Sequence, residues 1–142
     1  MQNNPEIEQI VEQALKIARD KQHEYVLTEH MLLALIRYNP FNAVLQKHGT
    51  DVALLDHELN QYLDSLISLV KVNNENQPKK TNALERTFNR ALTQVLFTGR
   101  RVVTPVDLYL AVMSENNSHA HYFLLKYGVK KAERSEEHTS EL

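Results

Sequence analysis

The sequence predicts an all-α fold made of two pseudo-symmetric four-helix repeats, the second of which lacks its last helix. The first observation behind this prediction is an internal repeat, because a shift of 77 positions aligns residues 7–35 with residues 84–112 without a gap. The second is that apolar residues in both copies follow the three-and-four spacing of a helical face, while no segment reads as a strand of useful length. A repeat of this length indicates two small helical units that cover each other's apolar faces.

The repeat continues beyond this segment with a small change of register. A loop that is two residues longer in the second copy moves the offset to 79, so that Leu45 matches Leu124 and Gly49 matches Gly128. Matched apolar positions in the first segment include Ile7 and Leu84, Val11 and Phe88, Ala14 and Ala91, Leu15 and Leu92, Leu33 and Leu110, and Leu35 and Val112.

The first copy, residues 1–67, begins with two expected helices. Pro5 suits the first turn of a helix that extends to about Lys21. Thr28 is a candidate cap for the second helix. The second helix is apolar on more than one face, so we expect it to be buried between its neighbours as the central element of the unit.

Two shorter signals complete the first copy. Asn39-Pro40 opens a brief third helix, and Gly49 is placed to end it in the left-handed conformation. Asp51 is expected to cap a fourth helix with one apolar stripe. The periodicity then stops, and residues 68–82 read as an exposed linker between the copies.

The second copy is expected over residues 83–133. Its first helix restarts near Thr81, and Gly99 closes it. The segment Thr104-Pro-Val-Asp107 offers a cap, a proline at the first helical position and an acid at the third, which together form a strong start signal. Ser118 is placed to begin the next helix.

The counterpart of the fourth helix is missing from the second copy. The residues after Glu133 have no apolar stripe and no match in the first copy. Residues 134–142, Arg-Ser-Glu-Glu-His-Thr-Ser-Glu-Leu, are the translation of AGA TCG GAA GAG CAC ACG TCT GAA CTC, a common sequencing-library adapter. We interpret this segment as foreign to the protein, and we expect the native sequence to continue with an eighth helix.

Composition limits the classes of function. The 142 residues are 42% hydrophobic, enough for one core shared by the two copies, and the formal net charge of −2 gives no global attraction to nucleic acid or anionic membrane. The absence of cysteine removes disulfides, thiol nucleophiles and thiolate metal sites. No apolar run is long enough to span a bilayer, and the N-terminus lacks the features of a signal peptide, so a cytoplasmic location is expected.

The segment 23–35, His-Glu-Tyr-Val-Leu-Thr-Glu-His-Met-Leu-Leu-Ala-Leu, carries a family resemblance. It resembles the "H-E-F/Y-x-x-x-E-H-L-L-L-A-L" segment of the Clp amino-terminal repeat domain, a paired four-helix module at the front of the Hsp100 unfoldases. Residues 103–112 match the same pattern more loosely, with Asp107 in place of His30. The pair His23-Glu24 and the linker before Leu84 are more similar to the ClpA branch than to ClpB or ClpC.

The resemblance implies a non-enzymatic domain that receives adaptors or substrates for an ATP-dependent AAA+ unfoldase. It implies a ClpS-like adaptor as partner, a ClpP-type protease reached through the rest of the protein, and a hexameric full-length assembly. ATP and Mg²⁺ are expected only in the AAA+ modules outside this chain, because the three glycines here form no phosphate-binding loop. Neither nucleic acid nor a membrane is an expected partner.

The resemblance and the loop positions together nominate a set of partner-binding residues: His23, Glu24, Tyr25, Gln77, Lys80 and Thr81. The docking region is expected just before the fifth helix. A structural interpretation competes for the first two, in which they brace the loop between the first and second helices. A weaker, family-based alternative pairs His23 with Asp64 as zinc ligands, although no histidine spacing here matches a catalytic zinc motif.

Other interpretations stay open. For Glu29-His30, the favoured one is a helix-start acid beside a half-buried histidine that hydrogen-bonds the neighbouring repeat, not an acid-base pair. Within the binding class, a ClpC- or ClpB-type module or a stand-alone Clp protein-binding module are alternatives. A helix-turn-helix regulator would use residues 104–113 as its recognition helix, but that helix carries no basic residue. An enzyme has the least support, because no constellation supplies nucleophile, base and oxyanion donors together.

We expect a protein that ends at Glu133 to be unstable or to self-associate. About four or five apolar side chains would lose their cover, each worth about 1.5–3 kcal/mol when fully buried, against a total stability of about 5–15 kcal/mol. Thermal unfolding of this protein should be compared with that of a protein carrying the native continuation. Matching cooperative melts would contradict the expectation.

Overall fold

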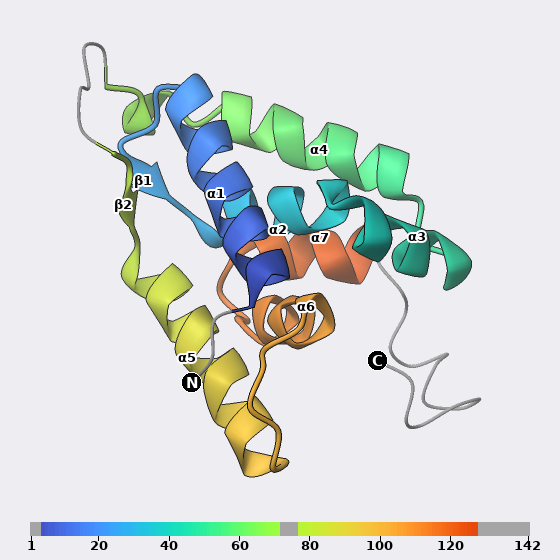
Figure 1. The fold of residues 1–142 in the computed structure, drawn as a ribbon. Helices are drawn as coiled ribbons and strands as arrows, with labels where there is room; N and C mark the ends of the chain where they lie inside the picture. Colours follow the sequence, from blue (N-terminus) through green and yellow to red (C-terminus); the bar gives the residue numbers. More distant parts are fainter. Residues whose placement is uncertain (1–3, 72–76, 128–142) are drawn as a thin grey trace.

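A computed structural model describes residues 4–71 and 77–127 of the chain (Figure 1). The first copy contains α1 (Pro5–Asp20), α2 (Thr28–Arg37), α3 (Asn39–Lys47) and α4 (Val52–Asp64), followed by a 3-10 turn, η1 (Ile67–Leu69). The second contains α5 (Asn82–Phe97), α6 (Pro105–Met113) and α7 (His119–Tyr127). The predicted all-α repeat fold is confirmed. The expected eighth helix, the stop at Gly128 and residues 134–142 lie outside the described residues.

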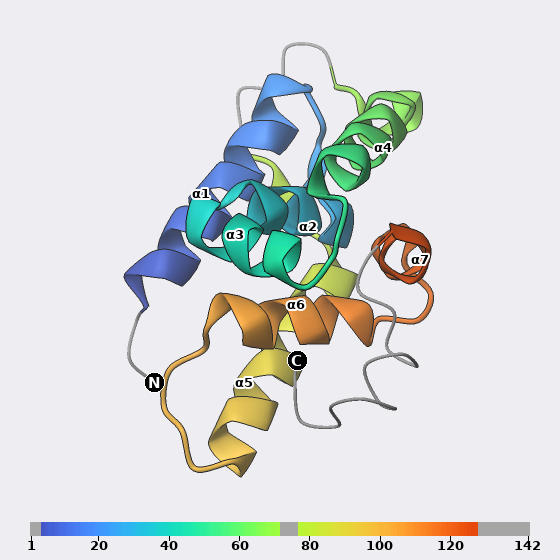
Figure 2. The same ribbon diagram turned by 90° about the vertical axis from the view of Figure 1, so that its right-hand side faces the viewer.

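α2 is the centre of the molecule, as its all-round apolar sequence predicts. It contacts α1, α3 and α4 of its own copy and α5, α6 and α7 of the other (Figure 2). All of its residues from Thr28 to Ile36 are buried, and only Arg37 at its end is exposed. The two copies therefore share one core, and the edge-on contact of Phe41 in α3 with Tyr109 in α6, at 5.2 Å between ring centroids, belongs to the interface between them.

The helix starts confirm the caps that the sequence predicts, with one exception. Asp51 accepts from the Leu54 N–H, and Thr104 and Asp107 form a reciprocal capping box. Thr81 caps α5 in the same way that Asn4, at the equivalent position of the first copy, caps α1. These side chains satisfy backbone donors that a helix leaves unpaired at its N-terminus.

The exception is the start of α2. Thr28 is the first residue of the helix, and the cap position belongs to Leu27, whose side chain has no acceptor. The Leu27 N–H donates to His30 Nδ1 at 2.8 Å, so the imidazole performs one half of a capping box. The prediction that Thr28 caps this helix is wrong, because the acceptor comes from inside the helix.

The ends of α1 and α5 repeat the same backbone geometry. Gln22 has a φ of 60° and Gly99, its equivalent in the second copy, has a φ of 80°. The residues that follow them, His23 and Arg100, donate their N–H to the carbonyl five residues earlier at 2.8 and 3.0 Å. Glycine adopts this left-handed conformation without the cost that a side chain adds. The second copy therefore has an unstrained backbone at Gly99, whereas the first copy accepts the cost of a left-handed Gln22.

The segment 68–82 is more structured than an exposed linker. β1 (Tyr25–Val26) and β2 (Lys79–Lys80) form a parallel two-stranded ladder that pairs Tyr25 with Lys79 and Val26 with Lys80. These strands are only two residues long, in agreement with the absence of longer strand signals. The ladder ties the start of the second copy to the connection between α1 and α2 (Figure 1). The boundaries 1–67, 68–82 and 83–133 stay predictions.

We expect Thr104→Ala to lower the free energy of unfolding by about 1 kcal/mol, because it removes the acceptor for the Asp107 N–H at the start of α6. Urea unfolding followed by circular dichroism measures the change. Thr93→Ala, at an exposed position inside α5, is the matched control and should leave stability unchanged or slightly higher. Equal losses from both substitutions would contradict a specific role for the cap.

Candidate functional site

The β1–β2 ladder brings the predicted partner-binding residues together. His23, Glu24 and Tyr25 lie on the connection from α1 to α2, whereas Gln77, Lys80 and Thr81 lead into α5. Backbone bonds join the two strands, from the Lys79 N–H to the Glu24 carbonyl at 2.9 Å and from the Thr81 N–H to the Val26 carbonyl at 3.2 Å. We call this surface, formed by residues 24–26 and 77–81, the junction.

Most of the junction's side chains reach solvent. Gln77 and Lys80 are exposed, and Glu24, Tyr25 and Thr81 are partly buried. Gln77 Oε1 accepts from Arg19 of α1 at 2.9 Å, and Glu24 lies 3.6 Å from the Lys71 ammonium group. The Lys80 ammonium group lies 5.8 Å from the centroid of the Phe88 ring. The junction therefore offers polar and charged groups that packing and hydrogen bonds hold in place.

His23 does not belong to this exposed surface, although the sequence nominates it as a contact residue. Its side chain is 1% exposed, and its Nδ1 lies 2.8 Å from His30 Nε2. Since His30 Nδ1 already accepts from the Leu27 N–H, the hydrogen-bond network assigns the proton to Nε2, which donates to His23. The competing interpretation, that His23 braces the loop between the first and second helices, is confirmed.

The histidine pair is held neutral. Burial, with the neighbouring His23 and Lys21 acting in the same direction, lowers the pKa of His30 to about 3. Burial also lowers the pKa of His23, with Lys21 acting in the same direction and Asp64 and a backbone hydrogen bond at Leu63 opposing them. A proton added to either ring would place two N–H groups face to face or leave a charge in the core.

Glu29, not His30, reaches the other copy. The Glu29 carboxylate accepts from the Ala120 N–H at 2.8 Å and from the Thr28 hydroxyl at 3.2 Å. It therefore lies at the N-terminus of α7, where a negative charge is favourable. The prediction that His30 is half-buried and bonds the neighbouring repeat is wrong, because its ring is fully buried and both of its nitrogens serve the first copy.

The second copy repeats the histidine pair with different chemistry. Arg100 and Asp107 occupy the positions equivalent to His23 and His30, and they form a two-pronged ion pair at 2.7 and 3.0 Å. Asp107 also accepts from the N–H of Thr104, as His30 does from that of Leu27. Burial opposes ionisation of Asp107, but its bonds to Arg100 and Thr104 prevail and lower its pKa.

A family model described as the Clp repeat (R) N-terminal domain matches residues 3–127. The chain belongs to this family. A ClpA homolog protein from Fuscovulum blasticum is 32% identical over 119 residues, which make up 83% of this chain and 15% of that relative. The Clp N-terminal domain described here therefore spans a small part of the length of this relative.

Solved structures agree on the fold. The N-terminal domain of Hsp104 from Candida albicans has a TM-score of 0.77 at 11% identity and covers 89% of this chain and 81% of that one. The N-terminal domain of the chaperone ClpD from Arabidopsis thaliana has a TM-score of 0.67 at 14% identity, with 87% and 82% covered. A chain studied as part of a malarial protein secretion system has a TM-score of 0.78 at 13% identity, with 89% and 85% covered.

The helix-turn-helix alternative does not fit this Clp N-terminal domain. The expected recognition helix is α6, which buries Pro105, Asp107, Leu108, Tyr109, Ala111 and Val112. A helix that packs most of its surface into the core has no face left to enter a DNA groove. No helix of the described residues is both long and apolar enough to cross a membrane.

The zinc alternative finds little support in the donor set. Nδ1 of His23 is engaged by His30, and Asp64 accepts from the Lys21 ammonium group at 2.5 Å. Across residues 4–71 and 77–127, no cluster of three or more histidine, aspartate and glutamate side chains is arranged to hold a metal ion. A protein site for zinc needs at least three such ligands, so the pair is incomplete.

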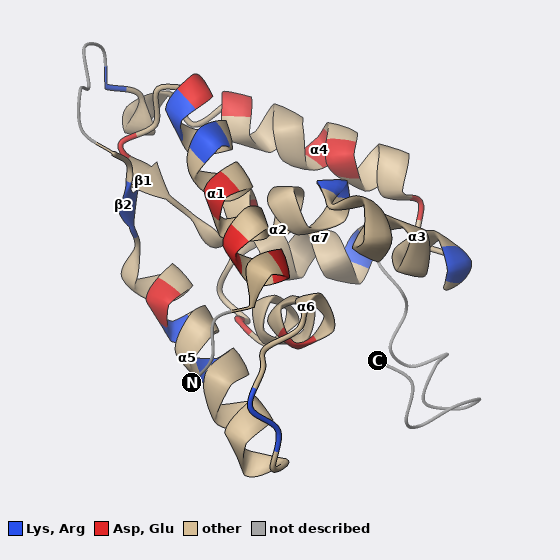
Figure 3. Ribbon diagram, viewed as in Figure 1, with Lys and Arg blue, Asp and Glu red and all other residues tan. Residues whose placement is uncertain are grey.

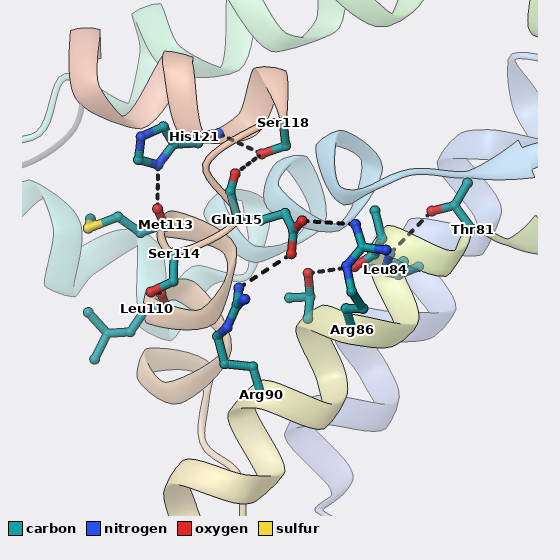
Figure 4. Close-up of polar contacts among 12 residues, drawn as sticks. Thr81, Leu84, Arg86, Arg90, Leu110, Met113, Ser114, Glu115, Ser118 and His121 are labelled. Carbon is teal, nitrogen blue, oxygen red and sulfur yellow. Dashed lines mark hydrogen bonds and ion pairs between the residues drawn. The ribbon is translucent and has the colours of Figure 1, made fainter.

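Sequence reasoning missed one charged cluster. Arg86 and Arg90 of α5 both bind Glu115, which follows α6, at 3.0 and 3.3 Å (Figure 4). The signal was available in the four-residue spacing of the two arginines on the exposed face of a predicted helix. Their common partner was not, because it lies far along the chain in a loop that has no periodic pattern.

We expect the free energy of unfolding to decrease as the pH falls below about 6.5. The folded domain keeps His23 and His30 neutral, whereas in the unfolded chain both take up protons near the ordinary histidine pKa of 6.5. The unfolded state therefore binds more protons between pH 6.5 and about 3, and stability is lost over that range. Urea unfolding at a series of pH values measures this slope.

A matched pair of variants separates this effect from general acid sensitivity. His30→Gln should be less stable at neutral pH but show a flatter pH dependence, because the depressed group is gone. His57→Gln, at an exposed position on α4, should retain the slope of the unchanged protein. An unchanged slope in His30→Gln would show that the pair does not cause the loss.

Proposed function

We propose that this Clp N-terminal domain receives protein substrates and a ClpS-like adaptor through the junction and passes them to a ClpA-like AAA+ unfoldase. The observation that carries the proposal is the junction itself. The first copy and the segment that leads into α5 meet there, with Lys80 exposed on β2 and Gln77 exposed two residues before that strand. Backbone bonds already order this segment, so its backbone loses little freedom when a partner binds, which favours affinity.

The proposal extends to the protein of which this domain is a part. Similarity to a ClpA homolog protein supports a motor of the AAA+ class, which would bind ATP and Mg²⁺ and act as a hexamer beside a ClpP-type protease in the cytoplasm. A ClpC- or ClpB-type protein is the alternative. The two differ downstream, where a middle coiled-coil region or a protease-docking loop would distinguish them.

The direct test is adaptor binding by junction variants. Lys80→Glu reverses an exposed charge, and Gln77→Ala removes an exposed amide, so neither should disturb the core. Thr81 is left intact because it caps α5. Isothermal titration with a ClpS-like adaptor should show binding weakened by about tenfold in the Lys80→Glu variant, a change of about 1.4 kcal/mol.

Lys47→Glu is the matched control, because Lys47 is exposed on α3, which lies on the opposite side of the domain from β2 in Figure 1. It should bind the adaptor as the unchanged domain does. Full affinity in the junction variants would remove the junction as the docking site. Absence of binding by the unchanged domain would remove the ClpS-like partner from the proposal.

A further inference from the structure

The exposed face of α5 carries a line of side chains that do not pack into the core. Asn82, Arg86, Arg90, Thr93 and Phe97 are spaced by four, four, three and four residues, which places them on one face of the helix. All five are exposed. We call these five residues the α5 stripe. α5 packs against α6 and α2 with its other faces.

Glu115 positions the two arginines of the stripe. Its carboxylate is 9% exposed and binds one guanidinium group with each oxygen, while the side chains of Arg86 and Arg90 stay 59% and 43% exposed (Figure 4). Two positive charges thus face one negative charge, and each arginine retains free N–H donors. Guanidinium groups fixed in this way are suited to bind a further carboxylate at little entropic cost.

The charge of the surrounding segment reinforces this preference. Residues 77–101 contain six lysines and arginines and a single acid, Glu85, for a net charge of +5, while the residues outside this segment and outside the foreign residues 134–142 carry −5. Figure 3 shows this basic segment along β2, α5 and the loop after α5. Glu85 lies on α5 but about 100° around the helix from Arg86, outside the stripe. The basic surface is local and would attract an acidic partner.

The stripe ends in an apolar tip. Phe97 is 87% exposed and Leu96 is 55% exposed, at the end of α5 that extends past α6 (Figure 2). Two large apolar side chains in water at the end of a basic face are typical of an interaction surface. Arg90 and Phe97 are seven positions apart, about 10 Å along the helix, a distance that about three residues of an extended peptide span.

We propose that the α5 stripe docks an acidic segment of a partner protein, with carboxylates on Arg86 and Arg90 and an apolar side chain about three residues later against Phe97. The inference rests on the proposed function only in that the occupant is a protein. The stripe begins at Asn82, next to the junction residue Thr81, and continues along α5 away from the junction. The net charge of −5 outside both the basic segment and residues 134–142 disfavours a long polyanion such as nucleic acid.

The test uses fluorescence anisotropy with a labelled peptide of about ten residues that carries aspartates followed by leucine and phenylalanine. A second peptide replaces the aspartates with asparagine. The 142-residue chain should bind the acidic peptide at least about tenfold more tightly than the amide peptide, and added salt should weaken the binding. Arg90→Gln and Phe97→Ser should each reduce the affinity by about tenfold.

Two control variants separate this proposal from the proposed function. Lys47→Gln should bind the acidic peptide as the unchanged chain does, and Lys80→Glu should retain most of the affinity for this peptide. A failure of peptide binding to the stripe can therefore be told apart from a failure of adaptor binding at the junction. Phe97→Ser breaks no packing in the described fold, so it tests the stripe even if Arg90→Gln loosens Glu115. Equal binding of both peptides, no effect of Phe97→Ser, or tighter binding of a single-stranded oligonucleotide than of the acidic peptide would overturn the proposal.

Discussion

Burial of α2 on every side is the constraint on which the rest of the structure depends. Leu32, Leu33, Leu35 and Ile36 are 0% exposed, and truncation of such a side chain in a packed core costs about 2–5 kcal/mol. Against a total stability of about 5–15 kcal/mol, one such change removes a large share. Because helices of both copies cover α2, neither copy has a complete core of its own, and the two must fold together.

The same constraint explains the chemistry of the helix starts. A helix that is buried at its N-terminus must satisfy its first N–H groups from within the protein. At the start of α2, the His30 ring accepts a hydrogen bond from the Leu27 N–H. The neighbouring Glu29 carboxylate accepts one from the Ala120 N–H at the start of α7. Two polar groups in the core of the first copy are thus structural, although an imidazole next to a carboxylate in sequence resembles acid-base machinery.

Local patterns in the sequence predicted most of the fold, whereas contacts between distant segments needed the structure. Apolar spacing, caps at Asp51 and Thr104, and left-handed glycines depend on neighbours within a few residues, so they are readable from the sequence alone. The pairing of β1 with β2 and the bonds of Glu115 to α5 join distant segments without periodicity. The partner-binding role of the nominated residues stays a prediction. The burial of His23 was not predicted, because it depends on how α4 packs.

The domain consequently presents two exposed surfaces with different origins. The junction exists because the segment before α5 pairs as a strand with the first copy, and backbone bonds hold that segment in place. The α5 stripe exists because α5 packs only one side against the core, and a buried acid fixes its arginines. Contacts of moderate strength on two separate surfaces add up when one partner engages both, because the second contact then forms at a high effective concentration.

The exchange of His23 and His30 for Arg100 and Asp107 bears on how distant relatives are compared. Each pair joins the end of the first helix of its copy to the start of the second helix. Each pair also accepts a hydrogen bond from the N–H of the residue that precedes the second helix, Leu27 in one copy and Thr104 in the other. A comparison that scores positions one by one counts two mismatches here, although the interaction is retained. Identities of 11–14% beside TM-scores of 0.67–0.78 show that this fold persists through extensive change in sequence.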